Sequence, residues 1–328
     1  MSRLSSLLVV VVAACGGSPK PSPGVPLPED TKPAPAPDAT PAAPAAAATP
    51  AAPAPPPTAP LDVKVPALDT TVKLVSSGTG KKQAMRYTLK PGAKQTVEFA
   101  MDFTGKQDTD TKVVPTLVLT GEAETKAVDP DGNAEFAVTI TSTDARAVEG
   151  SQIPIDQFKK ALGALSGLTI GGKLNATGTA GELTLHLDNA PAELGEALQL
   201  IQLTLPRLPV LPKDAIGVGA RWQSVTPAKL IERLDVTQTT EYQVTAHKGA
   251  TWTITGKTTV AGKDQEIEGA KITGISGTGT SETTIADGVM YPSHKGSLET
   301  QFKVSDKDKT KSATVVLKVG GAVTPKTP

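Results

Sequence analysis

The side chains that most often carry catalysis are few in this chain and poorly placed for it. Its three histidines, His186, His247 and His294, stand far apart. None lies in a spacing such as His-Glu-x-x-His, which puts two imidazoles on one helix face to bind zinc. The chain has no Gly-x-Ser-x-Gly elbow, no phosphate-binding loop with Lys-Ser or Lys-Thr, and no dinucleotide fingerprint after a strand. We therefore expect surface histidines, a domain that is not an enzyme, and no metal site.

The single thiol of the chain, Cys15, is the residue whose surroundings indicate chemistry most clearly. Arg3 supplies a positive charge, and an apolar run over residues 7–12 follows it. This run is too short to span a bilayer, which takes about 20 residues, and two small residues separate it from the cysteine. We expect residues 1–14 to be a signal peptide that is cleaved before Cys15.

The sequence Val12-Ala13-Ala14-Cys15 resembles the lipobox of bacterial lipoproteins, in which an aliphatic residue and two small ones precede a cysteine. The resemblance is confined to the start of the chain. It implies that the Cys15 thiol receives a diacylglycerol and that the new amino terminus is often acylated too. Several acyl chains, each contributing about 0.8 kcal/mol per buried methylene, would anchor the protein far more firmly than one chain.

The residues after the cysteine bear on the choice of membrane. In the resembled family, an Asp directly after the cysteine retains a lipoprotein in the inner membrane, whereas Gly16 and Gly17 stand here. The resemblance therefore favours the outer membrane over the inner membrane of the cell envelope. The alternative is an ordinary secretory signal with an incidental cysteine, in which case Cys15 carries no lipid.

Residues 15–60 differ in composition from the rest of the chain, because proline and alanine dominate them. Ordering a backbone costs about 1–2 kcal/mol per residue, and this stretch has almost no large apolar side chains to bury against that cost. Its prolines favour polyproline II at about 3.1 Å per residue, which gives a reach of up to roughly 140 Å. We expect a disordered tether over 15–60 and a single domain over 61–328.

The charge balance argues against nucleic acid as a partner. Lysine and arginine number 33, as do aspartate and glutamate, whereas nucleic-acid-binding domains usually carry a basic surplus. Beyond Cys15 there is no cysteine for a disulfide or a thiolate metal site, and no second apolar run long enough to span a membrane. We expect no cofactor.

Alternation of apolar and polar residues predicts a mainly β domain. Between Val97 and Phe103, every second residue is apolar, which places one face of the strand inward. Turn residues such as Pro91-Gly92 and Asp287-Gly288 separate the expected strands. These strands are 83–90, 94–104, 114–126, 134–148, 168–180, 182–188, 220–226, 233–247, 250–261, 265–281, 285–291, 294–305 and 311–319. They predict one large, curved antiparallel sheet that is half-barrel-like, with 61–80 as a transitional segment.

Two stretches change to the spacing of three and four that is typical of an amphipathic helix. The first runs roughly from 154 to 166, begins at Pro154, and has an apolar stripe of Ile155, Phe158, Leu162 and Leu165. The second begins near Pro191 and has an apolar stripe of Leu194, Leu198, Ile201 and Leu205. We expect two helices inserted in the sheet fold.

Three further features are expected to be structural. Trp222 and Trp252 are predicted as core anchors, since aromatic residues make up only 3% of the chain. The glycines of 274–279 lie in a threonine-rich strand, where glycine marks a bend more often than a phosphate-binding loop. Asn175-Ala176-Thr177 matches a glycosylation acceptor only formally.

The expected architecture is similar in outline to half-barrel lipoprotein carriers, which shield acyl chains between a sheet and helices. The resemblance implies a non-catalytic module that binds an apolar or lipid ligand in that space. The candidate ligand-binding residues are Phe99, Phe103, Phe136, Phe158, Leu162, Leu198 and Ile201. The same residues could instead close a solid core, because protein interiors normally pack densely.

The second hypothesis is a structural or interaction protein of the cell envelope, presented to another envelope protein on its long tether. The segment rich in proline and alanine supports it, since a soluble carrier needs no such tether. An open interior would favour the carrier, and a filled interior the interaction protein.

Overall fold

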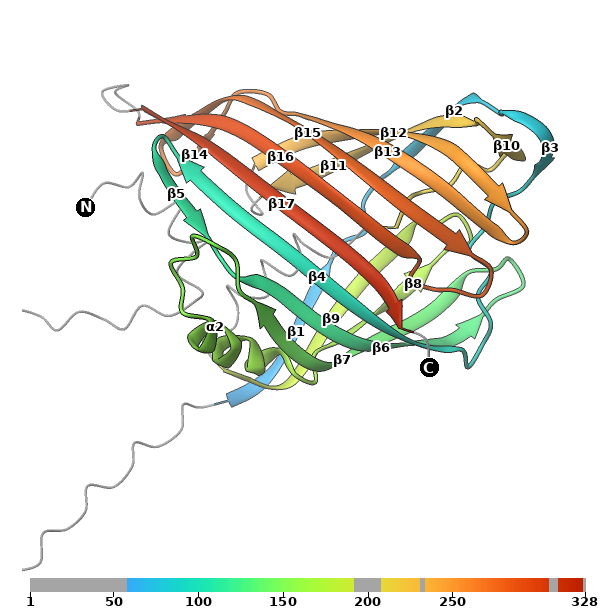
Figure 1. Ribbon diagram of the computed structural model, residues 1–328, viewed down its shortest axis with the longest axis horizontal. Coiled ribbons are helices and arrows are strands. Elements are labelled where there is room, and N and C mark those ends of the chain that lie inside the picture. Colours follow the sequence, from blue (N-terminus) through green and yellow to red (C-terminus); the bar gives the residue numbers. More distant parts are fainter. Residues whose placement is uncertain (1–57, 192–207, 231–233, 307–311, 327–328) are drawn as a thin grey trace, which may run out of the picture.

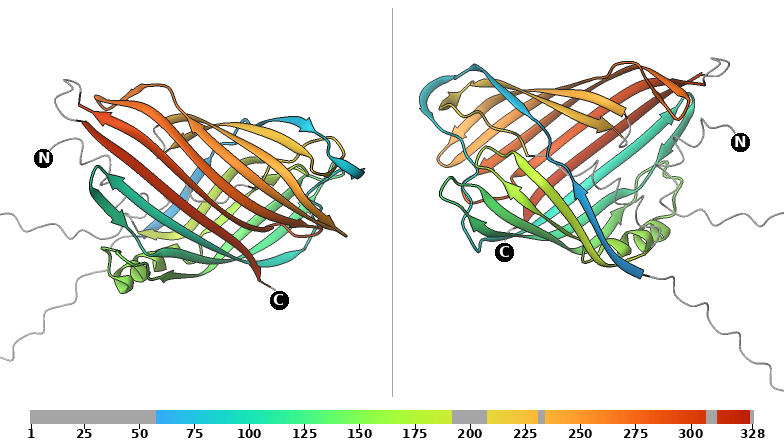
Figure 2. Two further views of the ribbon diagram at one scale, coloured as in Figure 1. Left: turned by 45° about the horizontal axis from the view of Figure 1, so that its top comes forward. Right: turned by 180° about the vertical axis from the view of Figure 1, so that it is seen from behind.

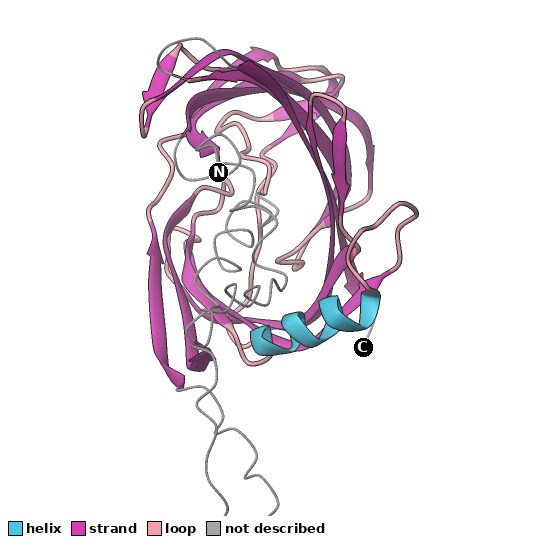
Figure 3. Ribbon diagram, turned by 90° about the vertical axis from the view of Figure 1, so that its left-hand side faces the viewer, coloured by secondary structure: helices cyan, strands magenta, loops and turns pink. Residues whose placement is uncertain are grey.

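The computed structural model describes residues 58–191, 208–230, 234–306 and 312–326. They form a mainly β protein built on one large antiparallel sheet, which confirms the expected class (Figure 1). The sheet curves around an interior, and its two edges do not pair with each other (Figure 3). Cys15, the predicted signal peptide and nearly all of the predicted tether lie outside the described residues.

The two edges of this sheet are β1 (Thr58–Val65) and β2 (Thr71–Ser76), which are consecutive in the chain. The segment 66–70 therefore connects one edge to the other. Across the sheet the order is β1-β9-β8-β7-β6-β4-β17-β16-β15-β13-β12-β11-β2, with β5 added to β4 and β14 added to β15. A small second sheet pairs β3 with β10. The segment 61–80, expected to be transitional, thus supplies both edges of the sheet.

Residues 110–113 and 216–218 form strands where none was predicted, and the predicted strand 168–180 already ends at Leu174. These and the remaining strands complete the two sheets. Their bounds are β3 (Thr79–Gln83), β4 (Lys94–Gln107), β5 (Asp110–Val113), β6 (Thr116–Val128), β7 (Ala134–Arg146), β8 (Thr169–Leu174), β9 (Ala180–Pro191), β10 (Ile216–Val218), β11 (Arg221–Leu230), β12 (Leu234–Lys248), β13 (Thr251–Ala261), β14 (Gln265–Ile267), β15 (Ala270–Ala286), β16 (Ser293–Ser305) and β17 (Ser312–Lys326). The predicted hairpin of 114–126 and 134–148 is confirmed as β6 and β7, with Val128 paired to Ala134.

The two faces of β4 follow the predicted alternation. Val97 and Phe99 are buried in the interior. Glu98 between them faces outward, and Arg146 Nη2 on β7 lies 2.6 Å from its Oε1. A period of two therefore separates an apolar inner face from a charged outer face.

The predicted strand over 83–90 is wrong, because β3 already ends at Gln83. Tyr87 is nevertheless buried. Its amide donates to the Ala176 carbonyl at 2.9 Å, and its hydroxyl donates to the Pro209 carbonyl at 3.0 Å. These partners lie in loops rather than in β4, so the segment is held inside the molecule without strand pairing.

One short helix is present in the described residues, α2 (Ile155–Leu162), followed by the 3₁₀ helix η2 (Gly163–Leu165). Pro154 stands directly before it, and Phe158 and Leu162 are its buried residues. The first predicted helix is thereby confirmed.

Nearly all of the second predicted helix lies outside the described residues. Pro191, expected near its start, is the last residue of β9. Residues 192–207 lie outside the described part of the chain, and Leu198 and Ile201 lie with them.

β15 differs from the prediction at both ends. The expected strand 265–281 is divided by a turn at Glu268-Gly269 into β14 and β15. The expected strand 285–291 is wrong, because a turn follows Ala286, and the Gly288 amide donates to the Thr88 carbonyl at 3.0 Å. In this region, turn residues outweigh the β propensity of their neighbours.

The predicted glycine bend in β15 is confirmed at Gly274. This residue has a φ of +63°, which residues with a side chain rarely adopt. It lies where the pairing with β16 shifts register between Thr273 and Ser276. Such a bulge bends the strand locally, as a strongly curved sheet requires.

Both tryptophans are core anchors, as predicted. Trp222 and Trp252 are buried in one cluster at one end of the sheet, and Trp222 Nε1 donates to the Val210 carbonyl at 2.9 Å. A second cluster, which includes Phe99 and Phe136, lines the half of the sheet from β1 to β4. A third, around Phe302, lies on β12 to β17.

Candidate ligand cavity

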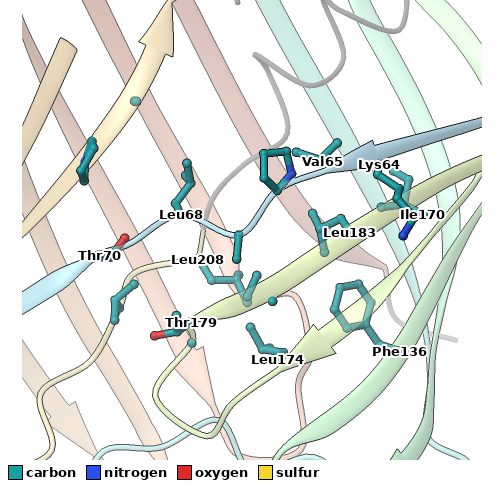
Figure 4. Close-up of a pocket in the computed structure, with 18 of the residues that line it drawn as sticks. Lys64, Val65, Leu68, Thr70, Phe136, Ile170, Leu174, Thr179, Leu183 and Leu208 are labelled. Carbon is teal, nitrogen blue, oxygen red and sulfur yellow. The ribbon is translucent and has the colours of Figure 1, made fainter. Parts of the chain in front are cut away.

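A cavity of about 620 Å³ lies between the inner face of β7 to β9 and the segment 66–70 (Figure 4). Its size falls within the range of roughly 300–1,000 Å³ that is typical of small-molecule sites. Apolar side chains dominate the lining: Val63, Val65, Leu68, Phe136, Ile170, Leu174, Leu183, Leu208, Val210, Met290 and Tyr291. The described interior is therefore not filled solidly at this place.

The opposite wall comes from the other half of the sheet. Pro227, Ala228 and Lys229 of β11 line it, together with Asp235 at the start of β12. β2 pairs with β11 only as far as Val225, so β11 continues past its partner beside the cavity. The cavity thus lies where the two edges of the open sheet come closest in sequence, at the connection between β1 and β2.

The turn between β8 and β9 supports the floor of the cavity. Asn175 Oδ1 accepts hydrogen bonds from the amides of Thr177 at 3.0 Å and Thr179 at 2.9 Å. Gly178 has a φ of +90°, and a Cβ there would come within 2.6 Å of Tyr87 Cε2 and 2.8 Å of the Pro209 oxygen. Only glycine fits such a position. The formal glycosylation triplet is therefore a turn whose asparagine oxygen holds the backbone.

Gln95 of β4 fixes another part of the wall. Its Oε1 accepts from the amides of Met290 at 3.1 Å and Tyr291 at 3.0 Å, and its Nε2 donates to the Tyr291 carbonyl at 2.8 Å. The Tyr291 ring stands edge-on to Phe99, with 5.3 Å between ring centroids. Burial raises the pKa of Tyr291, so its hydroxyl is uncharged at neutral pH. This wall is rigidly held and carries no charge.

Two ion pairs stand at the rim of the cavity. Lys64 Nζ lies 2.9 Å from Glu182 Oε1, and Lys229 Nζ lies 3.1 Å from Asp235 Oδ1. Both pairs are well exposed to solvent. Each lysine is matched by a carboxylate, so the rim has no excess of either charge.

The structure brings some of the predicted ligand-binding residues together and separates others. Phe136 lines the cavity, and Phe99 backs it through Tyr291. Phe158 and Leu162 join the same buried cluster from α2 without lining the cavity. The prediction that Phe103 binds the ligand is wrong for this cavity. Phe103 lies further along β4, is half-buried, and packs against the cluster around Phe302.

Several lining residues were missed by the sequence analysis. Val63 and Val65 lie in the segment taken as transitional, although Leu61, Val63 and Val65 alternate with polar residues as a strand would. Leu183 was assigned to a strand face but not to a site. Leu68 belongs to the connection between β1 and β2, and no local pattern indicates its role.

His186 lies on the outer face of β9, as predicted. Its Nδ1 is 2.8 Å from Asp62 Oδ1 on β1, and its Nε2 is 3.1 Å from Asp188 Oδ1. Hydrogen bonding to Asp62, and then to Asp188, raises the pKa of His186. The imidazole thus helps to attach the edge strand β1.

The other two histidines are half-buried rather than fully exposed, so the expectation of surface positions holds for them only in part. His247 stacks on Trp252, with ring centroids 3.6 Å apart. His294 Nδ1 lies 2.8 Å from Thr283 Oγ1, and burial lowers the pKa of His294. Both lie within strands, since His247 of β12 pairs with Trp252 of β13 and His294 of β16 pairs with Thr283 of β15.

Comparison with known proteins adds no family to this picture. No family model matches the sequence, and no curated protein matches it. Among the described residues, no group of three or more His, Cys, Asp or Glu side chains is placed to hold a metal ion. No described helix has the length and hydrophobicity needed to cross a membrane.

Proposed function

We propose that this protein is a lipid-anchored envelope lipoprotein whose non-catalytic β domain binds an apolar ligand in the cavity beside segment 66–70. The apolar cavity is the observation that carries the proposal. Its volume of about 620 Å³ lies in the range of sites that hold one small molecule, which suits a ligand with a single acyl chain.

The chemistry of the lining supports a hydrophobic ligand. Burial of apolar surface contributes about 25 cal/mol per Å², and side chains such as Phe136, Leu174 and Leu183 offer that surface (Figure 4). The balanced ion pairs of Lys64 and Lys229 at the rim favour a neutral or zwitterionic head group over a strongly charged one.

A tryptophan that fills the cavity tests the proposal. The full chain with Cys15→Ser is purified without detergent, and any lipid that it retains is identified by native mass spectrometry. The protein is then delipidated and titrated with a fluorescent fatty acid. Leu183→Trp should weaken binding of the probe at least about tenfold, because the larger ring occupies the cavity. Thr139→Trp, on the exposed face of β7, is the matched control and should bind the probe normally.

A chain that binds no probe and retains no lipid would contradict the carrier function. That result would favour the envelope interaction protein. Equal loss of binding in Leu183→Trp and Thr139→Trp would also contradict the assignment of the ligand to this cavity.

Attachment to the membrane is proposed from Cys15 and the preceding Val12-Ala13-Ala14. Labelled palmitate should be incorporated into the unchanged protein in its native host, and the label should appear in the outer-membrane fraction. Cys15→Ser should abolish labelling and release the protein from membranes. Unchanged fractionation of Cys15→Ser would contradict the lipid anchor.

A further inference from the structure

The exposed large hydrophobic side chains of the described chain gather at one end of the molecule. They are Val75 on β2, 59% accessible, and Val218 on β10, 41% accessible. β2 leads through a short turn into β3, which pairs with β10, so that Val218 is opposite Thr79. Figure 1 shows β2, β3 and β10 together at this end. We call the exposed surface of residues 73–83, 218–221 and 248 the tip.

The tip is also basic. Its exposed cations are Lys73, Lys81, Lys82, Arg221 and Lys248. None of them forms an ion pair with another described residue. Lys82 Nζ donates to Ser77 Oγ at 2.5 Å, which leaves its charge uncompensated.

The sequence around the tip explains this excess of positive charge. No aspartate or glutamate occurs between Asp69 and Glu98, and Asp214 is the one carboxylate in the adjoining stretch 208–221. The hydrogen bond of 3.0 Å between Gln83 Nε2 and His247 Nε2 brings the end of β12, and with it Lys248, beside β3. A chain whose total charge is balanced therefore has a locally cationic end.

Exposed apolar side chains among lysines are what an anionic bilayer surface binds. We propose that the tip docks on an anionic phospholipid bilayer, with Val75 and Val218 entering the head-group layer and the lysines near the phosphates. A single-stranded nucleic acid is less suited, because it needs exposed aromatic rings for base stacking, and Trp222 and Trp252 are buried behind the tip.

The position of the tip in the molecule fits this role. β1, the first described strand, begins at the end of the sheet opposite to β2 and β3 (Figure 2). The start of the described domain is therefore far from the tip. This surface is separate from the cavity, so its test does not depend on the proposed ligand.

Vesicle flotation tests the docking surface. The full chain with Cys15→Ser is mixed with vesicles of phosphatidylcholine alone or with about one-third phosphatidylglycerol. Each lysine near an anionic surface contributes about fivefold to binding, so replacing Lys73, Lys81 and Lys82 by Gln should weaken anionic-vesicle binding roughly a hundredfold. Val75→Ser with Val218→Ser should weaken it further.

The matched control is a triple Lys→Gln variant of Lys257, Lys295 and Lys318, which are exposed on β13, β16 and β17. It makes the same change in net charge and should bind within about twofold of the parent. Binding by the parent should fall steeply between low and high salt.

Three results would overturn the proposal. They are unchanged binding by the tip variant, an equal loss in both triple variants, and binding that ignores phosphatidylglycerol. Tighter binding of an oligonucleotide than of anionic vesicles, lost in the tip variant, would assign the surface to nucleic acid instead. Leu183→Trp should bind vesicles normally, which separates this result from that of the cavity.

Discussion

Lysines at the cavity rim and lysines at the tip have the same chemistry and opposite surroundings. At the rim, Lys64 and Lys229 each face a carboxylate within 3.1 Å. At the tip, Lys81 and Lys82 have no acidic partner among the described residues. The large hydrophobic side chains exposed in the same region are the valines Val75 and Val218. The cavity region thus has an apolar interior with a neutral rim, whereas the tip has an apolar and cationic exterior.

This difference shows how little the total charge says about partners. Equal numbers of acidic and basic residues argued against nucleic acid as a partner of the chain as a whole. Yet the charges are distributed unevenly, because one stretch of β2 and β3 contains no carboxylate at all. Surface electrostatics act within about 8–10 Å at physiological salt, so local excess decides what a surface attracts.

The largest expected difference between the two regions concerns glycine. Gly178 at the cavity floor and Gly80 at the tip both have positive φ angles, but only Gly178 is surrounded by close atoms. Gly178→Ala should lower the free energy of unfolding by about 3 kcal/mol or more, through strain and the clash with Tyr87. Gly80→Ala, which meets no atom within 4 Å, should cost about 1 kcal/mol.

Chemical denaturation of both variants beside the parent measures this contrast. Similar losses in the two variants would show that the packing around the turn of Asn175 is looser than the structure indicates. The cavity floor would then be no more rigid than the tip.

The sequence indicated the faces of strands much better than it indicated the cavity. Alternation along β4 and the turn between β6 and β7 are local properties, so they could be predicted. The cavity depends on residues 66–70 joining two edges of a sheet, which is a property of the whole topology. Leu68 and Tyr291 line the same cavity only because strands that are distant in the sequence pair with each other.

Two glutamine side chains, one beside the cavity and one at the tip, differ in how many groups they hold in place. Gln95 makes three hydrogen bonds to backbone groups of Met290 and Tyr291, whereas Gln83 at the tip bonds to the His247 ring alone. Gln95→Ala leaves backbone groups without partners and should cost about 2 kcal/mol. Gln83→Ala should cost less than about 1 kcal/mol.

Probe binding sharpens this prediction. Because Tyr291 lines the cavity, Gln95→Ala should also alter the affinity for the fluorescent fatty acid, and Gln83→Ala should not. If Gln83→Ala changed probe affinity as much as Gln95→Ala, the cavity and the tip would not be independent.

The two edge strands of the sheet, β1 and β2, differ in how a titratable side chain holds them. His186 attaches β1 through Asp62, and its pKa is raised by that carboxylate and by Asp188. The contribution is therefore fully present below the unfolded pKa of about 6.5 and is lost as the pH rises through the raised folded value. β1 should be protected from hydrogen exchange more strongly at pH 6 than at pH 8, relative to β2.

His186→Gln is the control, because it keeps a polar side chain that does not titrate. The difference in protection factors between β1 and β2 should then no longer depend on pH. A parent protein without this dependence would show that the ion pairs of His186 do not help to hold the edge strand.

The smallest expected effects are those of replacing a single lysine at the rim or at the tip. Lys64→Gln removes one exposed ion pair with Glu182, and such pairs contribute about 0–1 kcal/mol, so stability should hardly change. Lys81→Gln removes no pair and should leave stability unchanged, yet it should weaken binding to anionic vesicles about fivefold. Lys64→Gln should not affect vesicle binding. If Lys64→Gln weakened vesicle binding as much as Lys81→Gln, docking would follow the net charge of the protein, and the tip would have no special role.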